Sequence, residues 1–145
     1  MGGAGKWHPA GADFCYNRSM TQRTWTPEEL AVYAATARRL REEDREAEKE
    51  RRERAWAAAR AAAELLRRDF AVTRVVVFGS LANPERSFSR WSDVDIAAWG
   101  LNADNWLRAI GAVMDMDTGF EMNLVDVTIC KPAILESINR DGIDV

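Results

Sequence analysis

The sequence predicts an α/β (α+β) fold in which a small mixed sheet with flanking helices follows one long N-terminal helix. No Gly or Pro interrupts residues 28–72, which permits a single helix over this range. Two apolar runs, residues 75–78 and 94–98, are typical of buried strands. The later elements alternate in type: a helix candidate over 103–116, an apolar strand over 122–127, and a helix from Pro132 to near Gly142.

Changes in composition divide the 145 residues into three segments. Residues 1–25 are Gly-rich at first and lack hydrophobic periodicity, which predicts a disordered or extended leader. Residues 26–70 predict a long charged helical arm, and residues 71–145 predict one small domain. A domain of about 75 residues is near the lower limit for independent folding. We therefore expect it to lean on the preceding helix or on a partner.

The expected arm begins at residues 26–29, a Thr-Pro-Glu-Glu capping box with proline at the first helical position. An apolar stripe at helical spacing follows: Leu30, Tyr33, Ala34, Ala37 and Leu40. Residues 41–54 carry charges of alternating sign, and an apolar face resumes from Trp56 to Phe70. The charged middle is expected to be a solvated face or a hinge. Alternatively, the first stripe docks on another protein or on a second copy of this chain, forming a homo-oligomer.

Two short motifs stand at the ends of the first two expected strands. Gly79-Ser80 follows the first strand, and Asp93-Val94-Asp95 begins the second. Side chains two residues apart on a strand share a face, so Asp93 and Asp95 are expected to lie together. Two carboxylates held close on a surface of low dielectric repel one another. A hard divalent cation, Mg²⁺ above all, makes such a pair favourable.

The Gly-Ser motif suits an anion. Gly79 permits a sharp turn and a close approach of a ligand to the backbone. Ser80 can cap a following helical turn and leave backbone N–H groups directed outward. An anion site beside a cation site suits a nucleoside triphosphate with its metal ion, because phosphoryl-type transfer depends mainly on positioning and charge neutralisation.

Together these residues resemble the signature of the minimal nucleotidyltransferase (MNT) family of the polymerase-β superfamily, in which a strand ending in Gly-Ser precedes Asp-x-Asp on the next strand. The resemblance spans residues 70–145 and includes the order of the later strand and helices. It implies a polymerase-β-like nucleotidyltransferase fold for this segment. It also implies that Asp93 and Asp95 bind Mg²⁺ and that Gly79 and Ser80 bind the phosphates of ATP.

The sequence departs from the family pattern in three places. The family has a third carboxylate on the last strand, where the register places Asn123, and Asp126 is expected to face away. An amide can complete the metal shell only weakly and cannot act as a general base, which counts against turnover. A one-residue bulge would bring Asp126 or Glu121 into the site. No Arg directly follows Gly-Ser, the nearest cations being Arg86 and Arg90, and the spacer is longer than usual.

The resemblance also implies an activity and a partner. MNT proteins often act as antitoxins that attach AMP to a HEPN-domain protein, a helical ribonuclease toxin. We therefore expect an ATP- and Mg²⁺-dependent adenylyltransferase with a HEPN-domain partner and with Asp93, Asp95 and Asn123 in its catalytic site. Proximity alone places Arg90 or Trp91 against the base or the phosphates. Larger relatives enclose a small acceptor with an added helical domain or a dimer wall, and the last residues are expected to supply neither.

Two other functions stay open. A catalytically reduced module of the same fold would bind nucleotide, or would neutralise or scaffold a partner by binding alone. Asn123 in place of a carboxylate favours this module, whereas the paired carboxylates of Asp93 and Asp95 argue against it. An aminoglycoside-type transferase acting on a small alcohol is disfavoured by the missing acceptor wall.

The composition limits the remaining classes of function. A net charge of −3 and a pI of about 5.3 give no basic surface for long nucleic acid. No apolar run reaches the roughly 20 residues that span a bilayer, and the N-terminus lacks the order of a signal peptide. Cys15 and Cys130 have no metal-type spacing, and His8 is the only histidine. These features predict a cytoplasmic protein with free thiols.

Overall fold

The computed structural model describes residues 24–145. They fall into two compact units, one that ends at Ala37 and one that comprises Arg38–Val145. The expected leader over residues 1–25 lies almost wholly outside the described residues, as do His8 and Cys15. Between residues 24 and 145, no helix has the length and apolar character that crossing a membrane requires.

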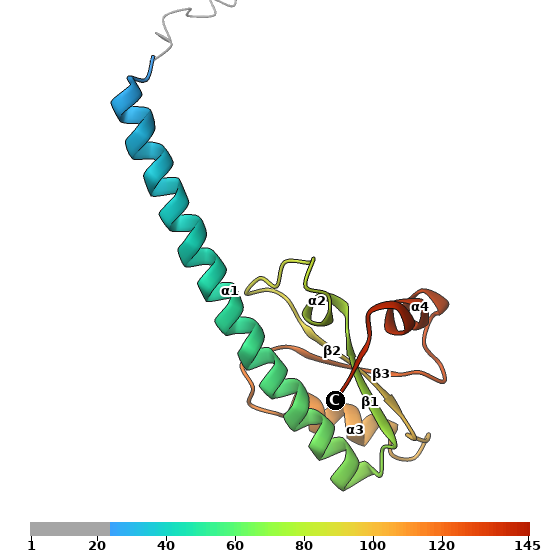
Figure 1. Cartoon of the computed structure of the whole chain (residues 1–145). Helices are drawn as coiled ribbons and strands as arrows, with labels where there is room; N and C mark the ends of the chain where they lie inside the picture. The colour runs from blue at the N-terminus through green and yellow to red at the C-terminus, as the bar shows by residue number, and fades with distance from the viewer. Residues whose placement is uncertain (1–23) are drawn as a thin grey trace, which may run out of the picture. The chain divides into compact units, whose positions relative to one another are not determined.

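The helices and strands follow the predicted order, which confirms the α/β class and the long N-terminal helix (Figure 1). Their bounds are α1 (Pro27–Phe70), β1 (Arg74–Phe78), α2 (Gly79–Ala82), β2 (Val94–Trp99), α3 (Trp106–Met114), β3 (Met122–Asp126), α4 (Pro132–Asp141) and β4 (Ile143–Asp144). The capping box forms as predicted. The Glu29 backbone N–H donates to Thr26 Oγ1 at 3.2 Å, and the Thr26 N–H donates to Glu29 Oε2 at 3.0 Å.

Two elements differ from the prediction. Helix α3 begins at Trp106 and not at residue 103, because Asn102 Oδ1 accepts hydrogen bonds from the backbone N–H groups of Asp104 and Asn105. These bonds hold the preceding residues in a turn. Strand β4 was not predicted, since two residues are too few to show an alternating pattern.

The four strands form a mixed sheet in the order β3-β2-β1-β4. Strand β1 pairs antiparallel with β2 and with β4, and β2 pairs parallel with β3. The register sets Phe78 opposite Asp95 and Asp95 opposite Asn123. The ladder between β2 and β3 runs residue for residue from Val94 to Ala98. It therefore contains no bulge that would turn a later carboxylate of β3 toward Asp95.

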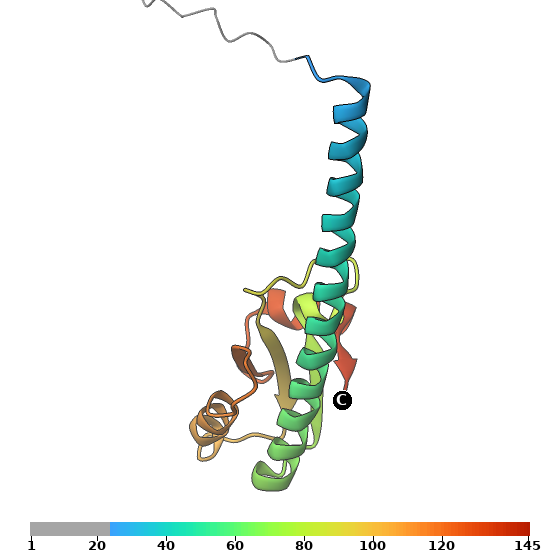
Figure 2. The same ribbon diagram turned by 90° about the vertical axis from the view of Figure 1, so that its left-hand side faces the viewer.

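Helices α1 and α3 cover one face of the sheet, and α4 covers the other (Figures 1 and 2). The face of α1 that meets the sheet is built largely of small side chains. Its buried residues are Ala55, Ala58, Ala59, Ala62, Ala63, Leu66 and Phe70. Alanines allow the helix to approach the strands closely, and the two larger residues fill the space near the end of the helix. The predicted apolar face of residues 56–70 is thereby confirmed.

Replacing Ala59 with Leu is expected to lower the free energy of unfolding by about 1–3 kcal/mol, because Ala59 is fully buried where α1 meets the sheet. Ala61→Leu, on the exposed side of the same helix, should change it by less than about 0.5 kcal/mol. Urea denaturation followed by circular dichroism measures both values. Equal effects at the two positions would show that the alanine face is not tightly packed.

Candidate functional site

The candidate site lies on the α4 face of the sheet, where β1 ends and β2 begins. Asp95 shares this face with Ala97, which packs with Ile138 of α4. Its chain neighbours Val94 and Ile96 point into the larger core on the α1 face and are fully buried. Strand alternation thus directs the Asp95 carboxylate toward the site while the residues on either side anchor the strand.

Gly79 and Asp95 are in direct contact. Gly79 has a φ of 72°, a conformation that side chains rarely adopt. A Cβ added to Gly79 would lie 2.5 Å from Oδ2 of Asp95. Position 79 therefore requires glycine for its backbone conformation and again for the space that the carboxylate occupies. This contact joins the Gly-Ser motif to the Asp-x-Asp motif.

Ser80 does not cap α2, so this expectation was wrong. The N-cap position belongs to Phe78, which has no side-chain capping hydrogen bond, and the helix begins directly at Gly79. The strand passes into the helix without an intervening residue, which places Ser80 inside the first turn. Ser80 is half-buried, and its backbone carbonyl accepts a hydrogen bond from Arg52.

Asp93, Asp95 and Asn123 come together at the ends of two adjacent strands. Asn123 Nδ2 donates hydrogen bonds to Asp93 Oδ2 at 3.3 Å and to Asp95 Oδ1 at 3.2 Å. All three side chains are half-buried. The amide N–H groups of Asn123 therefore bridge the two carboxylates and offset part of their mutual repulsion.

The electrostatic environment of Asp95 favours its neutral form. Burial is the main cause that raises the pKa of Asp95 above its ordinary value. The negative charge of Asp93 raises this pKa further, whereas the hydrogen bond from Asn123 and the positive charge of Arg86 act in the opposite direction. A carboxylate in this situation gains from a nearby cation.

The residues present fit one Mg²⁺ ion. Asp93 and Asp95 offer carboxylate oxygens, and Mg²⁺ is usually held by one or two carboxylates together with water and substrate oxygens. Asn123 presents its amide nitrogen, which does not ligate metals, so in this arrangement it holds the carboxylates in place. Within the described part of the chain, no group of three or more His, Cys, Asp or Glu side chains could hold a metal ion.

Asp126 lies outside the site, on the opposite face of β3 as the register predicts. Its Oδ1 accepts hydrogen bonds from the backbone N–H of Thr128 at 2.9 Å and from the Thr128 hydroxyl at 2.7 Å. Asp126 is buried at 9% exposure, and these bonds stabilise the turn after β3. It thus serves as a turn residue in this structure.

Arg90 and Trp91 lie at the rim of the site. They line a small cavity of about 120 Å³ together with Ser92, Asp93, Gly119, Phe120 and Glu121. The Arg90 guanidinium stacks over the Trp91 ring at 4.8 Å from its centroid, and both side chains are exposed. A contact from either residue to a nucleotide stays a prediction.

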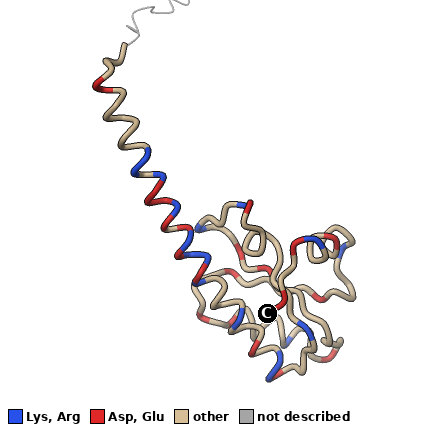
Figure 3. Tube along the Cα trace, viewed as in Figure 1, with Lys and Arg blue, Asp and Glu red and all other residues tan. Residues whose placement is uncertain are grey.

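Three residues of α1 that were not predicted as site residues contact α2 and the loop between α2 and β2. Figure 3 shows the charges of alternating sign along the middle of α1. Within this stretch, Glu48, Arg51 and Arg52 hydrogen-bond to residues between Ser80 and Phe88. The expectation that residues 41–54 are a solvated face or a hinge is therefore wrong at these three positions. Their i, i+3, i+4 spacing, which sets them on one side of the helix, was the available signal.

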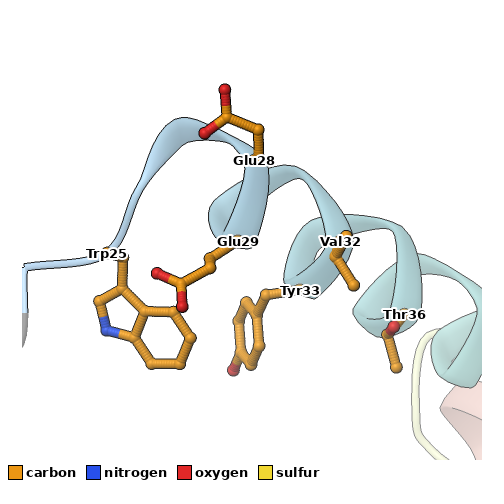
Figure 4. Close-up of a pocket in the computed structure, with 6 residues that line it drawn as sticks. All are labelled: Trp25, Glu28, Glu29, Val32, Tyr33 and Thr36. Atoms are coloured by element: carbon orange, nitrogen blue, oxygen red, sulfur yellow. The ribbon is translucent and has the colours of Figure 1, made fainter.

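A second cavity belongs to the unit that ends at Ala37. It measures about 480 Å³ and is lined by Trp25, Glu28, Glu29, Val32, Tyr33 and Thr36 (Figure 4). The rings of Trp25 and Tyr33 are 6.1 Å apart between centroids. Leu30 and Leu40 of the predicted docking stripe are also exposed, each at 51%. Docking of this stripe on a partner or on a second copy of the chain stays a prediction.

No protein-family model and no curated protein matches the chain. Similar solved structures include a mutant form of the MntA-HpeT toxin–antitoxin, with 16% identity and a TM-score of 0.48, covering 59% of this chain and 70% of that one. A toxin–antitoxin with AMP-PNP has 19% identity and a TM-score of 0.46, covering 57% and 67%. The tri-AMPylated Shewanella oneidensis HEPN toxin in complex with MNT antitoxin has 16% identity and a TM-score of 0.46, covering 62% of this chain and 70% of that one. These structures are of the class that the Gly-Ser and Asp-x-Asp motifs resemble. At such identities and TM-scores, they carry no conclusion about what this chain binds or does.

Gly79→Ala is expected to destabilise the fold by more than the roughly 1–2 kcal/mol that a side chain in left-handed conformation costs, because its Cβ would also meet Asp95. Gly119→Ala is the matched control, since Gly119 has a φ of 75° and no atom within 4 Å of an added Cβ. The same Gly79 change in an Asp95→Ala background should cost no more than the control. Free energies of unfolding in urea provide the comparison, and equal costs for the two single glycine variants would contradict the proposed contact.

Asp95→Asn is expected to make the metal-free protein more stable at pH 7. The pKa of Asp95 is raised in the folded state, so ionisation of this group lowers the free energy of unfolding. This loss of stability grows as the pH rises from the pKa of the unfolded state through the pKa of the folded state. The advantage of the variant should therefore disappear below the ordinary pKa of aspartate, about 3.9. Thermal unfolding from pH 3 to pH 8 with a chelator measures it. Asp117→Asn, at an exposed position, is the control for removing one acidic group.

Proposed function

We propose that this chain is a nucleotidyltransferase that binds ATP with Mg²⁺ and transfers AMP to a HEPN-domain protein, acting as its antitoxin. The observation that carries the proposal is the contact between Asp95 and Gly79. The carboxylate pair thereby lies directly beside a turn that begins with glycine. A cation bound by the carboxylates and a phosphate group bound by the turn would therefore be neighbours. The HEPN-domain partner is proposed from the resemblance of the motifs alone.

The proposed roles follow from the positions of the residues. Asp93 and Asp95 would hold the metal ion, which when bound neutralises phosphate charge and lowers the pKa of the acceptor hydroxyl. Asn123 orients both carboxylates through its two hydrogen bonds. The Gly79-Ser80 turn would receive the phosphates, and the positive charge of Arg86 acts on the neighbouring Asp95.

The transfer step is a displacement at phosphorus. The acceptor oxygen forms a bond to the α-phosphorus of ATP, the bond from this phosphorus to the bridging β-phosphate oxygen breaks, and pyrophosphate leaves. The acceptor hydroxyl also loses its proton. Asn123 cannot take this proton, because its amide is not basic, so the proton passes to water. Slow transfer is the expected consequence.

One observation favours a second function. The amide of Asn123 bridges the two carboxylates at the position where the resemblance leads one to expect a third carboxylate. This bridge stabilises the pair without catalysing proton removal. On this reading the chain binds nucleotide, or neutralises its partner, through binding alone. No comparable observation favours a small-molecule acceptor, so the aminoglycoside-type activity is not proposed.

The experiment that tests these proposals has two stages. Calorimetry with ATP and Mg²⁺ should show binding to the wild type and a loss of binding in Asp93→Ala and in Asp95→Ala. Incubation with a HEPN-domain protein and ATP labelled on its α-phosphate should then attach label to that protein. Binding without labelling would support the second function. Wild-type protein that binds no ATP would contradict AMP transfer and nucleotide binding, and would leave only neutralisation of the partner by binding.

Asn123→Asp is expected to raise the rate of AMP transfer by about 10²–10⁴-fold, which is the range for a positioned general base. The variant should also unfold at a lower temperature without Mg²⁺, because a third carboxylate replaces the donor that bridges the pair. Added Mg²⁺ should then stabilise it more than it stabilises the wild type. The exposed Asn139→Asp on α4 is the control for added charge. Labelling assays and thermal unfolding provide the two readouts.

A further inference from the structure

A half-buried arginine of α1 joins three separate parts of the chain. Arg52 Nη1 donates hydrogen bonds to the carbonyl oxygens of Ser80 and Leu81, both at 3.1 Å. Its Nη2 donates to the carbonyl oxygen of Arg86 and to Glu48 Oε1, the latter at 3.4 Å. One guanidinium thus connects α1, α2 and the loop of residues 83–93, which we call the spacer loop.

Glu48 and Arg51 extend this network to the middle of the spacer loop. Glu48 Oε1 accepts a hydrogen bond from the Phe88 backbone N–H at 2.7 Å, and Arg51 Nη1 donates to the Phe88 carbonyl at 3.2 Å. The Phe88 N–H is the main cause that lowers the pKa of Glu48, and Arg52 and Arg51 add to it. Phe88 itself is fully buried, with the Arg52 guanidinium 5.6 Å from its ring centroid. The spacer loop is therefore tied to α1 through both its backbone and a core side chain.

This network differs from the ordinary ion pairs along α1. The side chains of Arg52 and Glu48 are 19% and 32% exposed, whereas those of Arg39 and Glu43 are 70% and 63% exposed. An exposed helical pair contributes only about 0.3–0.5 kcal/mol. Arg52 also satisfies three backbone carbonyl groups that would otherwise need water. Loss of its guanidinium would leave those carbonyls without their partner in a partly buried place.

The parts that Arg52 joins are the parts that shape the site. Ser80 directly follows Gly79, whose Cα lies against the Asp95 carboxylate. Arg86 belongs to the spacer loop, and its positive charge acts on Asp95. The carbonyl groups of both Ser80 and Arg86 accept hydrogen bonds from the same guanidinium. The position of the Arg52 side chain therefore helps to fix both the Gly79-Ser80 turn and the backbone of Arg86.

We propose that Arg52 is a positioning residue that holds the Gly79-Ser80 turn and the Arg86 segment in place for a nucleoside triphosphate. The inference rests on the proposed function for the identity of this ligand. Its structural part, the fixing of the spacer loop, needs no ligand. Lysine at position 52 would keep the positive charge but lacks the planar fork that reaches three segments, so it should restore the loop only in part.

Limited trypsin digestion tests the structural part, because Arg86 and Arg90 are cleavage sites within the spacer loop. Cleavage under native conditions reports local opening of the loop. Arg52→Ala should be cut at these two sites about tenfold faster than the wild type, with Arg52→Lys between the two. Cleavage after Arg67 near the end of α1 reports unfolding of the whole unit and should remain much slower than cleavage in the spacer loop. Arg54→Ala, an exposed arginine on the same helix, is the matched control.

Calorimetry with ATP and Mg²⁺ tests the functional part. Arg52→Ala should bind about tenfold more weakly than the wild type, and Arg54→Ala should bind equally well. Unchanged loop cleavage in both Arg52 variants, full restoration by lysine, or a loosened loop with unchanged ATP affinity would each overturn the proposal. If Arg52→Ala does not fold, the Arg52→Lys variant carries both comparisons. If the wild type binds no ATP, the proposed function fails, and the digestion still decides whether Arg52 fixes the loop.

Discussion

The contact between the Asp95 carboxylate and the Cα of Gly79 is the constraint on which the site depends. It follows from the register, because Phe78 pairs with Asp95 and the chain must turn immediately afterwards. Only a residue without a side chain can turn there, both for its positive φ and for the space available. Two motifs separated in sequence are thus joined by backbone pairing, and neither could move along its strand without losing the other.

The site concentrates negative charge, and its neighbours partly compensate for it. Burial disfavours the ionised form of Asp95, while the Asn123 amide and the Arg86 charge favour it. Burial remains the dominant influence, so the arrangement is better suited to a bound cation than to an isolated carboxylate pair. The Asp126 carboxylate on the opposite face is satisfied by Thr128 within its own turn. Two acidic groups of neighbouring strands therefore have unrelated roles.

Much of the fold was predictable because its signals are local. The capping box at Thr26, the apolar runs of β1 and β2 and the proline that opens α4 each specify an element within a few residues. Strand alternation also predicted that Asn123 faces the site and Asp126 faces away, and the pairing of Asn123 with Asp95 agrees with this prediction. The missed features depend on tertiary contacts. Ser80 does not cap α2, because the preceding strand enters the helix directly. The hydrogen bonds from Arg52 to Ser80, Leu81 and Arg86 join residues 28 to 34 positions apart in the sequence. A charged helical segment has the same pattern whether its side chains face water or backbone carbonyls.

The tether at Phe88 has a consequence for how such a chain can vary in length. From residue 83 to Phe88 the spacer loop is bound to α1, whereas the four residues after it form a small local turn in which the Ser92 N–H donates to the Ser89 carbonyl and the Ser89 N–H to the Ser92 hydroxyl. Added or deleted residues in the first part would pull α1 and α2 out of alignment. The same change in the second part would leave the tether intact and would alter the turn at the rim of the site. Related sequences that keep this tether should therefore differ in length close to Asp93 and conserve the distance from Gly79 to the phenylalanine.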